Sequence, residues 1–187
     1  MSKFISIEEA VSKVKDGMTI MVGGFLANGT PNKIVDALAK SGVKNLTLIC
    51  NDTAYPDKGV GQLIANKQVK KQGSLAERVR AGGCGLGGIL TQTGMGTIVA
   101  EGKQIVNVDG KDYLLEKPLR ADIALVGASL GDKAGNLVYR GTSQNFNPLM
   151  ASAADLVIAE INELVEVGEI AAENVKTPSI MVDFIVK

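Results

Sequence analysis

The segment from Asp16 to Pro31 constrains the fold of this chain more than any other. Met18–Val22 is a short apolar run rich in strand-forming residues, and a run of this kind that stops at glycine predicts a buried strand. Pro31 suits the first turn of a helix, because the amide hydrogen that proline lacks would have no partner there. A second apolar run, Asn45–Cys50, follows this helix. A strand–helix–strand unit of this length predicts a parallel, right-handed crossover.

The same alternation continues along the rest of the chain. Apolar runs at Asp122–Val126, Leu156–Glu160 and Ile180–Val186 predict further strands, and Asn147-Pro148 predicts the start of another helix. Asp109-Gly110 lies between two strand-like runs and is a strong signal for a tight β-hairpin. These elements predict a single α/β domain over residues 1–187. Helices cover both faces of a mostly parallel, mixed sheet, which gives three layers, α/β/α.

The composition excludes several classes of function. Basic and acidic residues number 20 each, so no overall field favours nucleic acid or an anionic membrane, and a small molecule or another protein is the expected partner. The chain has no histidine and only two cysteines, which excludes histidine-dependent triads and the usual zinc sites. We therefore expect no metal and no permanently bound cofactor, with the chemistry carried by carboxylates, amides or a partner's residues.

The amino terminus carries acidic residues where a secretory signal would have its hydrophobic region. Ser6 and Glu9 have the spacing of a capping box, which predicts a short helix that begins at Ile7. We therefore expect a cytoplasmic protein.

Gly23 to Gly29 form a glycine-rich loop between the first strand and the crossover helix. A phosphate-binding P-loop would carry a lysine after its last glycine, and Thr30-Pro31 stands there instead, so we exclude a nucleoside triphosphate. The glycines could simply let the chain turn tightly. Alternatively, bare backbone between a strand end and a helix amino terminus exposes N–H groups that hold an anion without a charged side chain. The position of the loop favours the second interpretation.

A second glycine-rich run, Gly82–Gly88, predicts a flexible loop and contains the spacing Gly83-x-Gly85-x-x-Gly88 of a dinucleotide fingerprint. Such a fingerprint must follow a strand and open a helix, whereas this run follows a helical segment, so dinucleotide binding is a minor alternative. Asn51-Asp52 lies just past the second strand, at the edge where α/β sheets build their sites. The same pair is typical of an ordinary turn, and both interpretations stay open.

We assign no catalytic role to two polar regions of the sequence. Residues from Tyr139 to Asn147 are polar and aromatic and form either a contact with another subunit or a simple loop, and we favour the contact. Five acidic residues near the carboxyl end have the spacing of solvated surface and loop acids: Asp155, Glu160, Glu163, Glu166 and Glu169. We expect no catalytic pair among them.

Several motifs, spread over nearly the whole chain, form one combination. The first is Asp16-Gly17 followed by an apolar run and Gly23-Gly24-Phe25-x-x-x-Gly29-x-Pro31. The others are Asn51-Asp52-Thr53, the stretch Gln72–Gly83, Gly94-x-Gly96-Thr97, Asp132–Asn136 and Asn145-Phe146-Asn147-Pro148. Together they resemble the α subunit of family I coenzyme A transferases, closest to the acetate/butyrate–acetoacetate type. The combination is far more specific than either glycine loop alone.

The resemblance implies a two-subunit enzyme with a CoA-transferase type of α/β/α fold, commonly an α2β2 heterotetramer. Such enzymes move CoA between a thioester and a free carboxylic acid by a ping-pong route, in which a glutamate of the β subunit attacks the acyl-CoA. That glutamate lies in a Ser-Glu-Asn-Gly motif, which is absent from this chain; the nearest string, Ala172–Val175, lacks the serine and the glycine. The resemblance therefore implies an α subunit that is inactive without its β subunit, with an acyl-CoA thioester as substrate.

The resemblance also implies which residues of this chain approach the substrate. Gly23, Gly24 and Phe25 are expected to form the loop beside the reacting acyl group. Asn51 and Gln72 are expected to contact the acyl or carboxylate oxygens. The same site is expected to include four neighbours: Gly29, Asp52, Gly82 and Gly83.

One feature departs from the pattern of the family. Family members carry a further segment, with a histidine and a glycine-rich strand-to-loop stretch, between the positions that match Lys71 and Gln72. Here Val69-Lys70-Lys71 is followed directly by Gln72-Gly73. Either the protein has lost this segment or the sequence joins two parts across a gap. We favour a gap, because the loss of a sheet element would leave buried backbone groups unpaired.

Two other classes of function remain open at this point. The chain could be a non-catalytic small-molecule-binding or regulatory domain on the same scaffold, because a fold does not dictate a function. It could also, as the weaker alternative, be the dinucleotide-binding subunit of an oxidoreductase.

Overall fold

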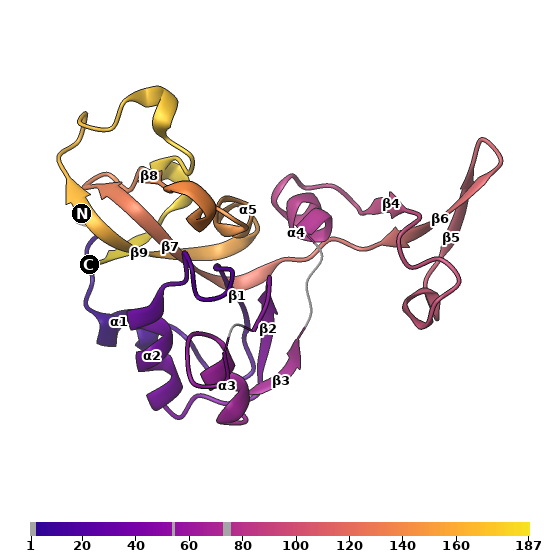
Figure 1. The fold of residues 1–187 in the computed structure, drawn as a ribbon, viewed down its shortest axis with the longest axis horizontal. Coiled ribbons are helices and arrows are strands. Elements are labelled where there is room, and N and C mark those ends of the chain that lie inside the picture. The colour runs from indigo at the N-terminus through magenta and orange to yellow at the C-terminus, as the bar shows by residue number, and fades with distance from the viewer. Residues whose placement is uncertain (1–2, 54, 73–75) are drawn as a thin grey trace.

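A central, mostly parallel sheet organises the molecule. The computed structural model describes residues 3–53, 55–72 and 76–187, without the side chains of residues 70–72 (Figure 1). The strands of the sheet lie in the order β10-β9-β7-β1-β2-β3, and β8 pairs with β7 as the antiparallel member. Their bounds are β1 Thr19–Val22, β2 Leu46–Cys50, β3 Val69–Gln72, β7 Ala121–Asp132, β8 Leu137–Val138, β9 Ala154–Val165 and β10 Phe184–Val186. The predicted α/β class with a mixed sheet is confirmed.

The amino-terminal half forms the crossover that the sequence predicts. α2 (Asn32–Lys40) connects β1 to β2, which pair in parallel from Thr19 opposite Thr47 to Val22 opposite Cys50. α1 (Ile7–Ser12) begins at the predicted cap, where Ser6 Oγ accepts a hydrogen bond of 3.1 Å from the Glu9 amide. α3 (Gly61–Ala65) then leads to the edge strand β3.

Two long strands dominate the carboxyl-terminal half. β7 and β9 have 12 residues each and pair in parallel from Ala121 opposite Ala154 to Asp132 opposite Val165. The sequence predicts both strands but underestimates their length, because polar residues follow the buried part of each. α5 (Asn147–Ser152) lies between them in the chain and begins at the predicted Asn-Pro pair. The predicted last strand is shorter than expected, since Ser179–Met181 forms a 3-10 turn before β10.

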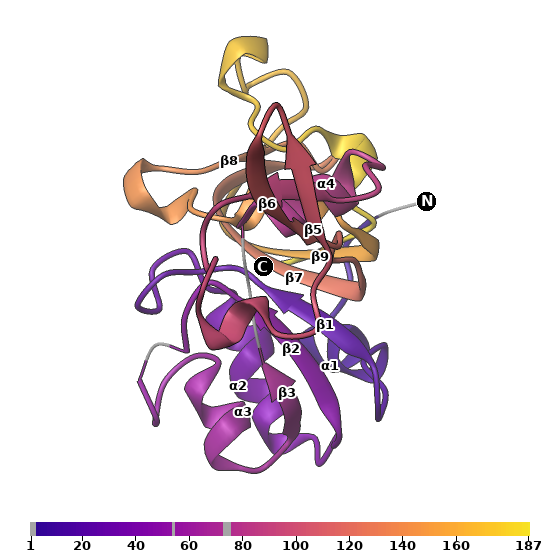
Figure 2. The same ribbon diagram turned by 90° about the vertical axis from the view of Figure 1, so that its right-hand side faces the viewer.

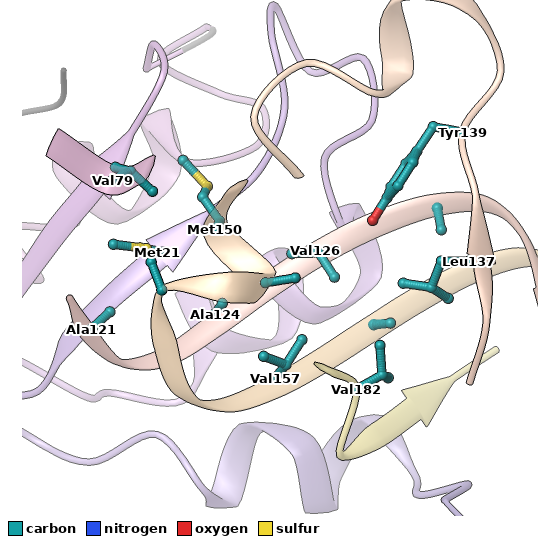
Figure 3. Close-up of a cluster of buried hydrophobic side chains, with 14 of the residues drawn as sticks. Met21, Val79, Ala121, Ala124, Val126, Leu137, Tyr139, Met150, Val157 and Val182 are labelled. Atoms are coloured by element: carbon teal, nitrogen blue, oxygen red, sulfur yellow. The ribbon is translucent and has the colours of Figure 1, made fainter. Parts of the chain in front are cut away.

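Helices cover both faces of this sheet. On one face α1, α2 and α3 contribute buried side chains such as Ala10, Leu38 and Leu63. On the other face α4 (Ala76–Gly83) and α5 pack against the sheet, and Figure 3 shows Val79 and Met150 beside one another in this cluster. The three predicted layers are therefore present.

A small antiparallel sheet stands apart from this body. β4 (Ile89–Thr91), β5 (Ile105–Val108) and β6 (Lys111–Glu116) form it in the order β4-β6-β5. The predicted hairpin at Asp109-Gly110 joins β5 to β6, and both of its turn residues have positive φ, 50° and 78°. Figure 1 shows this sheet as an arm that extends away from the central sheet, and Figure 2 shows the arm end-on, in front of the body.

The strand order places a topological switch point between β1 and β7. The chain builds β1, β2 and β3 toward one edge of the sheet and later builds β7, β9 and β10 toward the other edge. The crossover after β1 therefore lies on one face, and the connection from β7 to β9 through α5 lies on the opposite face. In open α/β sheets ligands bind outside the carboxyl ends of the strands at such a point.

Candidate functional site

The loop from Gly23 to Pro31 stands at the carboxyl end of β1 and folds into a tight turn. The Phe25 amide donates to the Asn28 carbonyl at 3.0 Å, and the Asn28 amide donates back to the Phe25 carbonyl at 2.9 Å. The two residues between them, Leu26 and Ala27, have φ of 49° and 64°. This is the geometry of a two-residue hairpin turn, here made by residues that rarely adopt positive φ.

Most amides of the loop already have partners within the protein. Gly23 N donates to the Leu125 carbonyl at 3.0 Å, Gly24 N to Asn145 Oδ1 at 3.1 Å and Leu26 N to Asp52 Oδ2 at 3.0 Å. The turn itself engages the amides of Phe25 and Asn28. The interpretation of these glycine residues as a row of free backbone donors is therefore wrong for the first half of the loop. Within the described part of the chain, Ala27, Gly29 and Thr30 are the loop residues after Gly23 whose amides have no hydrogen bond.

Asn147 fastens the second half of the loop to two other elements. Its Nδ2 donates to the Gly29 carbonyl and to the Ser143 carbonyl, each at 2.9 Å, and its Oδ1 accepts from the Gly127 amide at 3.1 Å. The side chain is fully buried. One amide side chain thus joins the glycine loop, the turn η2 (Gly141–Ser143) and β7.

Asn145 acts on the same loop from the other side. Its Oδ1 accepts from Gly24 N, and its Nδ2 donates to the Asn28 carbonyl at 3.1 Å. Together Asn145 and Asn147 form what we call the asparagine clamp. The structure therefore shows this part of Tyr139–Asn147 holding a loop within the chain, and the predicted contact of Tyr139–Asn147 with another subunit stays a prediction.

The clamp explains the glycines at its contact points. A Cβ on Gly23 would lie 1.7 Å from Asn147 Oδ1, and one on Gly29 would lie 2.3 Å from the Ser143 carbonyl oxygen. A Cβ on Gly127 would lie 2.5 Å from the Gly29 carbonyl oxygen. The glycines therefore give the space that this packing requires, in addition to the turn.

The predicted polar pair lies beside the loop at the end of β2. Asp52 is tied to the loop by its hydrogen bond from Leu26 N, and the neighbouring Asn51 is half-buried. The turn exposes Phe25 and Leu26 with 48% and 53% of their surfaces accessible. The structure thus brings together six of the predicted site residues at one edge of the sheet: Gly23, Gly24, Phe25, Gly29, Asn51 and Asp52.

The three remaining predicted site residues are placed differently. Gln72 ends β3, but its side chain lies outside the described residues, so its predicted contact stays a prediction. Gly82 and Gly83 belong to the last turn of α4 and are not part of a loop, contrary to the expected loop start. A Cβ there would lie 1.9 Å from the Leu119 carbonyl oxygen or 2.1 Å from Ser152 Oγ, so helix packing accounts for both glycines.

A cavity of about 300 Å³ opens beside the loop at the switch point between β1 and β7. Its walls come from the loop, the first turn of α2, η2 and the two long strands. The residues with polar side chains that line it are Asn28, Thr30, Asn32, Ser129, Arg140, Ser143, Glu160 and Asn162. Of the predicted site residues, only Gly29 lines this cavity.

Glu160 is the buried acid of this cavity. It lies on β9 with only 6% of its surface exposed, and its Oε2 accepts from the Ile34 amide at 3.0 Å. Burial raises the pKa of its carboxyl group, although the backbone amides at the start of α2 act in the opposite direction. The prediction that Glu160 is a solvated surface acid is therefore wrong. The sequence did contain one sign of this burial, because Glu160 ends the apolar run of a predicted strand.

The described residues contain no group of three or more histidine, cysteine and acidic side chains arranged to hold a metal ion. Among them no helix is long and apolar enough to cross a membrane. The glycine fingerprint at Gly83–Gly88 follows α4 and precedes β4, which is the reverse of the order that a dinucleotide site requires.

The sequence matches the model of the Coenzyme A transferase family over residues 4–72 and 71–187. It is 47% identical to the alpha subunit of acetoacetyl-CoA:acetate/butyrate CoA transferase from Clostridium acetobutylicum, over 100% of this chain and 98% of that protein. It is 46% identical to the acetate CoA-transferase subunit alpha of Escherichia coli strain K12, over 99% of this chain and 96% of that protein.

A solved structure shares the fold. The acyl-CoA transferase of Escherichia coli O157:H7, in a thioester complex with CoA, superposes with a TM-score of 0.84 at 21% identity, over 99% of this chain and 47% of that one. At this level of identity the likeness concerns the fold alone.

The alignments also bear on the junction between Lys71 and Gln72. The alignment with the Clostridium protein runs over 213 positions, whereas this chain has 187 residues, so the relative contains residues without a counterpart here. The family match divides at residues 71 and 72. In the structure this junction lies within the edge strand β3.

Proposed function

Because this chain belongs to the coenzyme A transferase family, we propose that it is the α subunit of an enzyme that moves CoA between a short-chain acyl-CoA, or acetoacetyl-CoA, and a free carboxylic acid. The identity of 47% along the whole length of an alpha subunit is the observation that carries this proposal. The exchange follows a ping-pong route with a covalent glutamyl intermediate. The glutamate comes from a β subunit, and the two subunits assemble as an α2β2 heterotetramer in the cytoplasm.

The division of labour between two subunits fits the chemistry of this chain. The string nearest to the expected nucleophile motif, Ala172–Val175, has its first three residues in a 3-10 turn, and Glu173 is exposed there. Phe25, Leu26 and Tyr55 expose about half of their surfaces near the ends of β1 and β2, where a partner would complete the site. The α subunit thus forms one wall of the active site, and the β subunit supplies the nucleophile.

Side-chain amides make most of the polar contacts to the reacting group. The amides of Gly23, Gly24 and Phe25 are already engaged, so these residues shape the loop beside the acyl group. Asn51 and Gln72 are the amide side chains proposed to contact the acyl or carboxylate oxygens. A donor placed where negative charge develops lowers the activation free energy by about 3 kcal/mol in comparable oxyanion sites.

We further propose that the natural protein carries additional residues between Lys71 and Gln72. The division of the family match at this junction and the greater length of the alignment support the proposal. The intact mass of the protein isolated from its native source checks it. A mass clearly above 19.5 kDa is expected, whereas 19.5 kDa would show that the shorter β3 connection is genuine.

The proposed activity is tested by CoA exchange from acetoacetyl-CoA to acetate and to butyrate. The chain is assayed alone, then mixed with a β subunit that carries Ser-Glu-Asn-Gly, and then mixed with the same β subunit in which that glutamate is changed to alanine. Activity is expected only in the second assay. Activity of this chain alone would place the nucleophile here and refute the division of labour. A confirmed complex without activity would favour a non-catalytic binding domain.

A further inference from the structure

The cavity at the switch point has groups that the protein itself does not satisfy. Asn32 Oδ1 lines it and is, among the described residues, the only buried side-chain nitrogen or oxygen without a hydrogen-bond partner. Ala27, Gly29 and Thr30 also line it, and their amides have no hydrogen bond within the described part of the chain. Buried polar groups in native proteins are almost always paired, so Asn32 Oδ1 calls for a ligand or a water, and the three amides, on half-buried residues, can donate to the same ligand. This cavity therefore fits a ligand with both acceptors and a donor.

The charges around the cavity narrow the class of ligand. Arg140 lies on one side, in an ion pair of 3.2 Å with Glu163, and both of these side chains are exposed. The first turn of α2 already donates the Ile34 amide to Glu160, whereas the amides of Ala27, Gly29 and Thr30 have no hydrogen bond within the described part of the chain and can donate to an anion. These groups favour an anion.

The buried Glu160 adds a restriction on that anion. A second negative charge close to a buried carboxylate is costly, so two adjacent carboxyl groups hold one proton between them. A carboxylic acid meets this condition, because it has two acceptor oxygens when ionised and one O–H donor when protonated. Phosphate and sulfate would bring more negative charge against the same carboxylate.

We propose that this cavity binds the carboxyl group of a small carboxylic acid, which shares one proton with the Glu160 carboxyl group. The ligand enters as a carboxylate together with one proton from solvent, and both leave on dissociation, so no covalent bond changes. The inference rests on the proposed function in one respect, that a free carboxylic acid is a substrate. It assigns that acid a position beside the asparagine clamp, next to the predicted loop.

Binding must then become weaker as the pH rises. Burial already raises the pKa of Glu160, and a bound carboxylate raises it further, so the complex takes up a proton that the free protein releases at higher pH. The other charged groups near Glu160 are Lys33 and Asp36 on α2, Arg140 beside η2 and Glu163 on β9. All four are exposed, so solvent screens their effect on the buried carboxyl group.

The test is a titration of the full chain with sodium butyrate and with sodium acetate, followed by NMR, from pH 5.5 to 8 at constant ionic strength. The amide signals of Gly29, Gly127 and Glu160 are expected to shift. Once the pH exceeds the pKa of Glu160 in the free protein, Kd is expected to rise about tenfold per pH unit.

Glu160→Gln provides the decisive variant. The glutamine keeps an oxygen that accepts from the Ile34 amide, so the fold is expected to persist, which thermal unfolding checks. Its NH2 group replaces the shared proton, and Kd is therefore expected to become independent of pH over this range. Asp155→Asn is the matched control, because it removes an exposed acid from the same strand outside the cavity, and it is expected to keep the pH dependence of the unaltered chain.

A second variant tests independently whether butyrate binds in this cavity. Asn32→Ala removes an amide side chain from the cavity wall, whose NH2 group can donate to a carboxylate oxygen once the amide turns over, and is expected to weaken butyrate binding at least fivefold at pH 5.5. The proposal is overturned if no cavity signal shifts with either acid, or if Glu160→Gln retains the pH dependence. These measurements need neither a thioester nor a β subunit. Binding without CoA exchange would therefore count against the proposed function alone, and exchange without binding in the cavity would count against this inference alone.

Discussion

The glycine loop and the arm are both rich in glycine, but they use it for different physical reasons. In the loop, a methyl group on Gly23 or Gly29 would collide with atoms of the clamp or its neighbours. In the arm and the segment before it, Gly85, Gly96 and Gly110 have open space around them and positive φ. Glycine therefore provides close approach in the loop, where Gly24 and Gly29 also have positive φ, and backbone conformation alone at these three positions of the other region. Similar composition does not mean that the two regions have similar roles.

The two regions also differ in how they are held. The loop is fixed by hydrogen bonds from a fully buried side chain, whereas Leu114 is the only buried hydrophobic residue among the described strands of the arm. The register of its strands places five apolar residues on one face, and none of them is buried: Leu90, Val106, Val108, Tyr113 and Leu115. The arm thus contributes little to the stability of the body, and the clamp contributes a great deal.

The largest expected effect comes from breaking the clamp. Asn147→Ala removes the hydrogen-bond partner of the Gly29 carbonyl and of the Gly127 amide and leaves a hole in a buried position. The free energy of unfolding should fall by about 3 kcal/mol, as measured by urea denaturation. Asn107→Ala in the arm also removes two hydrogen bonds, to Asp112 and from Gly110, but at an exposed site. It should cost less than about 1 kcal/mol. If the two variants lost the same free energy of unfolding, the clamp would contribute no more to stability than the arm.

A smaller effect is expected from adding one methyl group to each region. Gly23→Ala must push Asn147 away and should lower the free energy of unfolding by about 2 kcal/mol, because a well-packed site yields little. Gly87→Ala has open space and no positive φ, so it should change stability by less than about 0.5 kcal/mol. Thermal denaturation of the two variants in one buffer makes the comparison. An unfolding temperature of Gly23→Ala equal to that of Gly87→Ala would mean that the clamp is not rigid.

Local patterns predict the elements of this fold well. The capping box at Ser6, the crossover around Pro31 and the hairpin at Asp109-Gly110 each depend on residues close together in the chain. The edge of the sheet that carries Asn51 and Asp52 is also predictable, because parallel strands end on the same side. Sequence reasoning therefore located the glycine loop at the correct edge.

The fine structure of the site was not predictable, because it depends on distant partners. The apolar run before Glu160 indicates a buried strand, but nothing near it shows that its carboxylate accepts from the Ile34 amide, 126 residues away in the chain. Nothing near Asn147 in the sequence shows that its amide meets Gly29. Free and engaged amides look identical in sequence, so the loop was expected to offer more donors than it has.

The clamp has a consequence for the synthesis of the protein. Asn147 and Gly29 are separated by 118 residues, and the chain leaves the ribosome from its amino terminus. The loop therefore emerges early but cannot take its final shape until α5 has been made and docked. A nascent chain that stops before Asn145 carries every residue of the loop but lacks the contacts that Asn145 and Asn147 make with Gly24, Asn28 and Gly29. Until translation passes that point, exposed backbone at the end of β1 is available to chaperones and proteases.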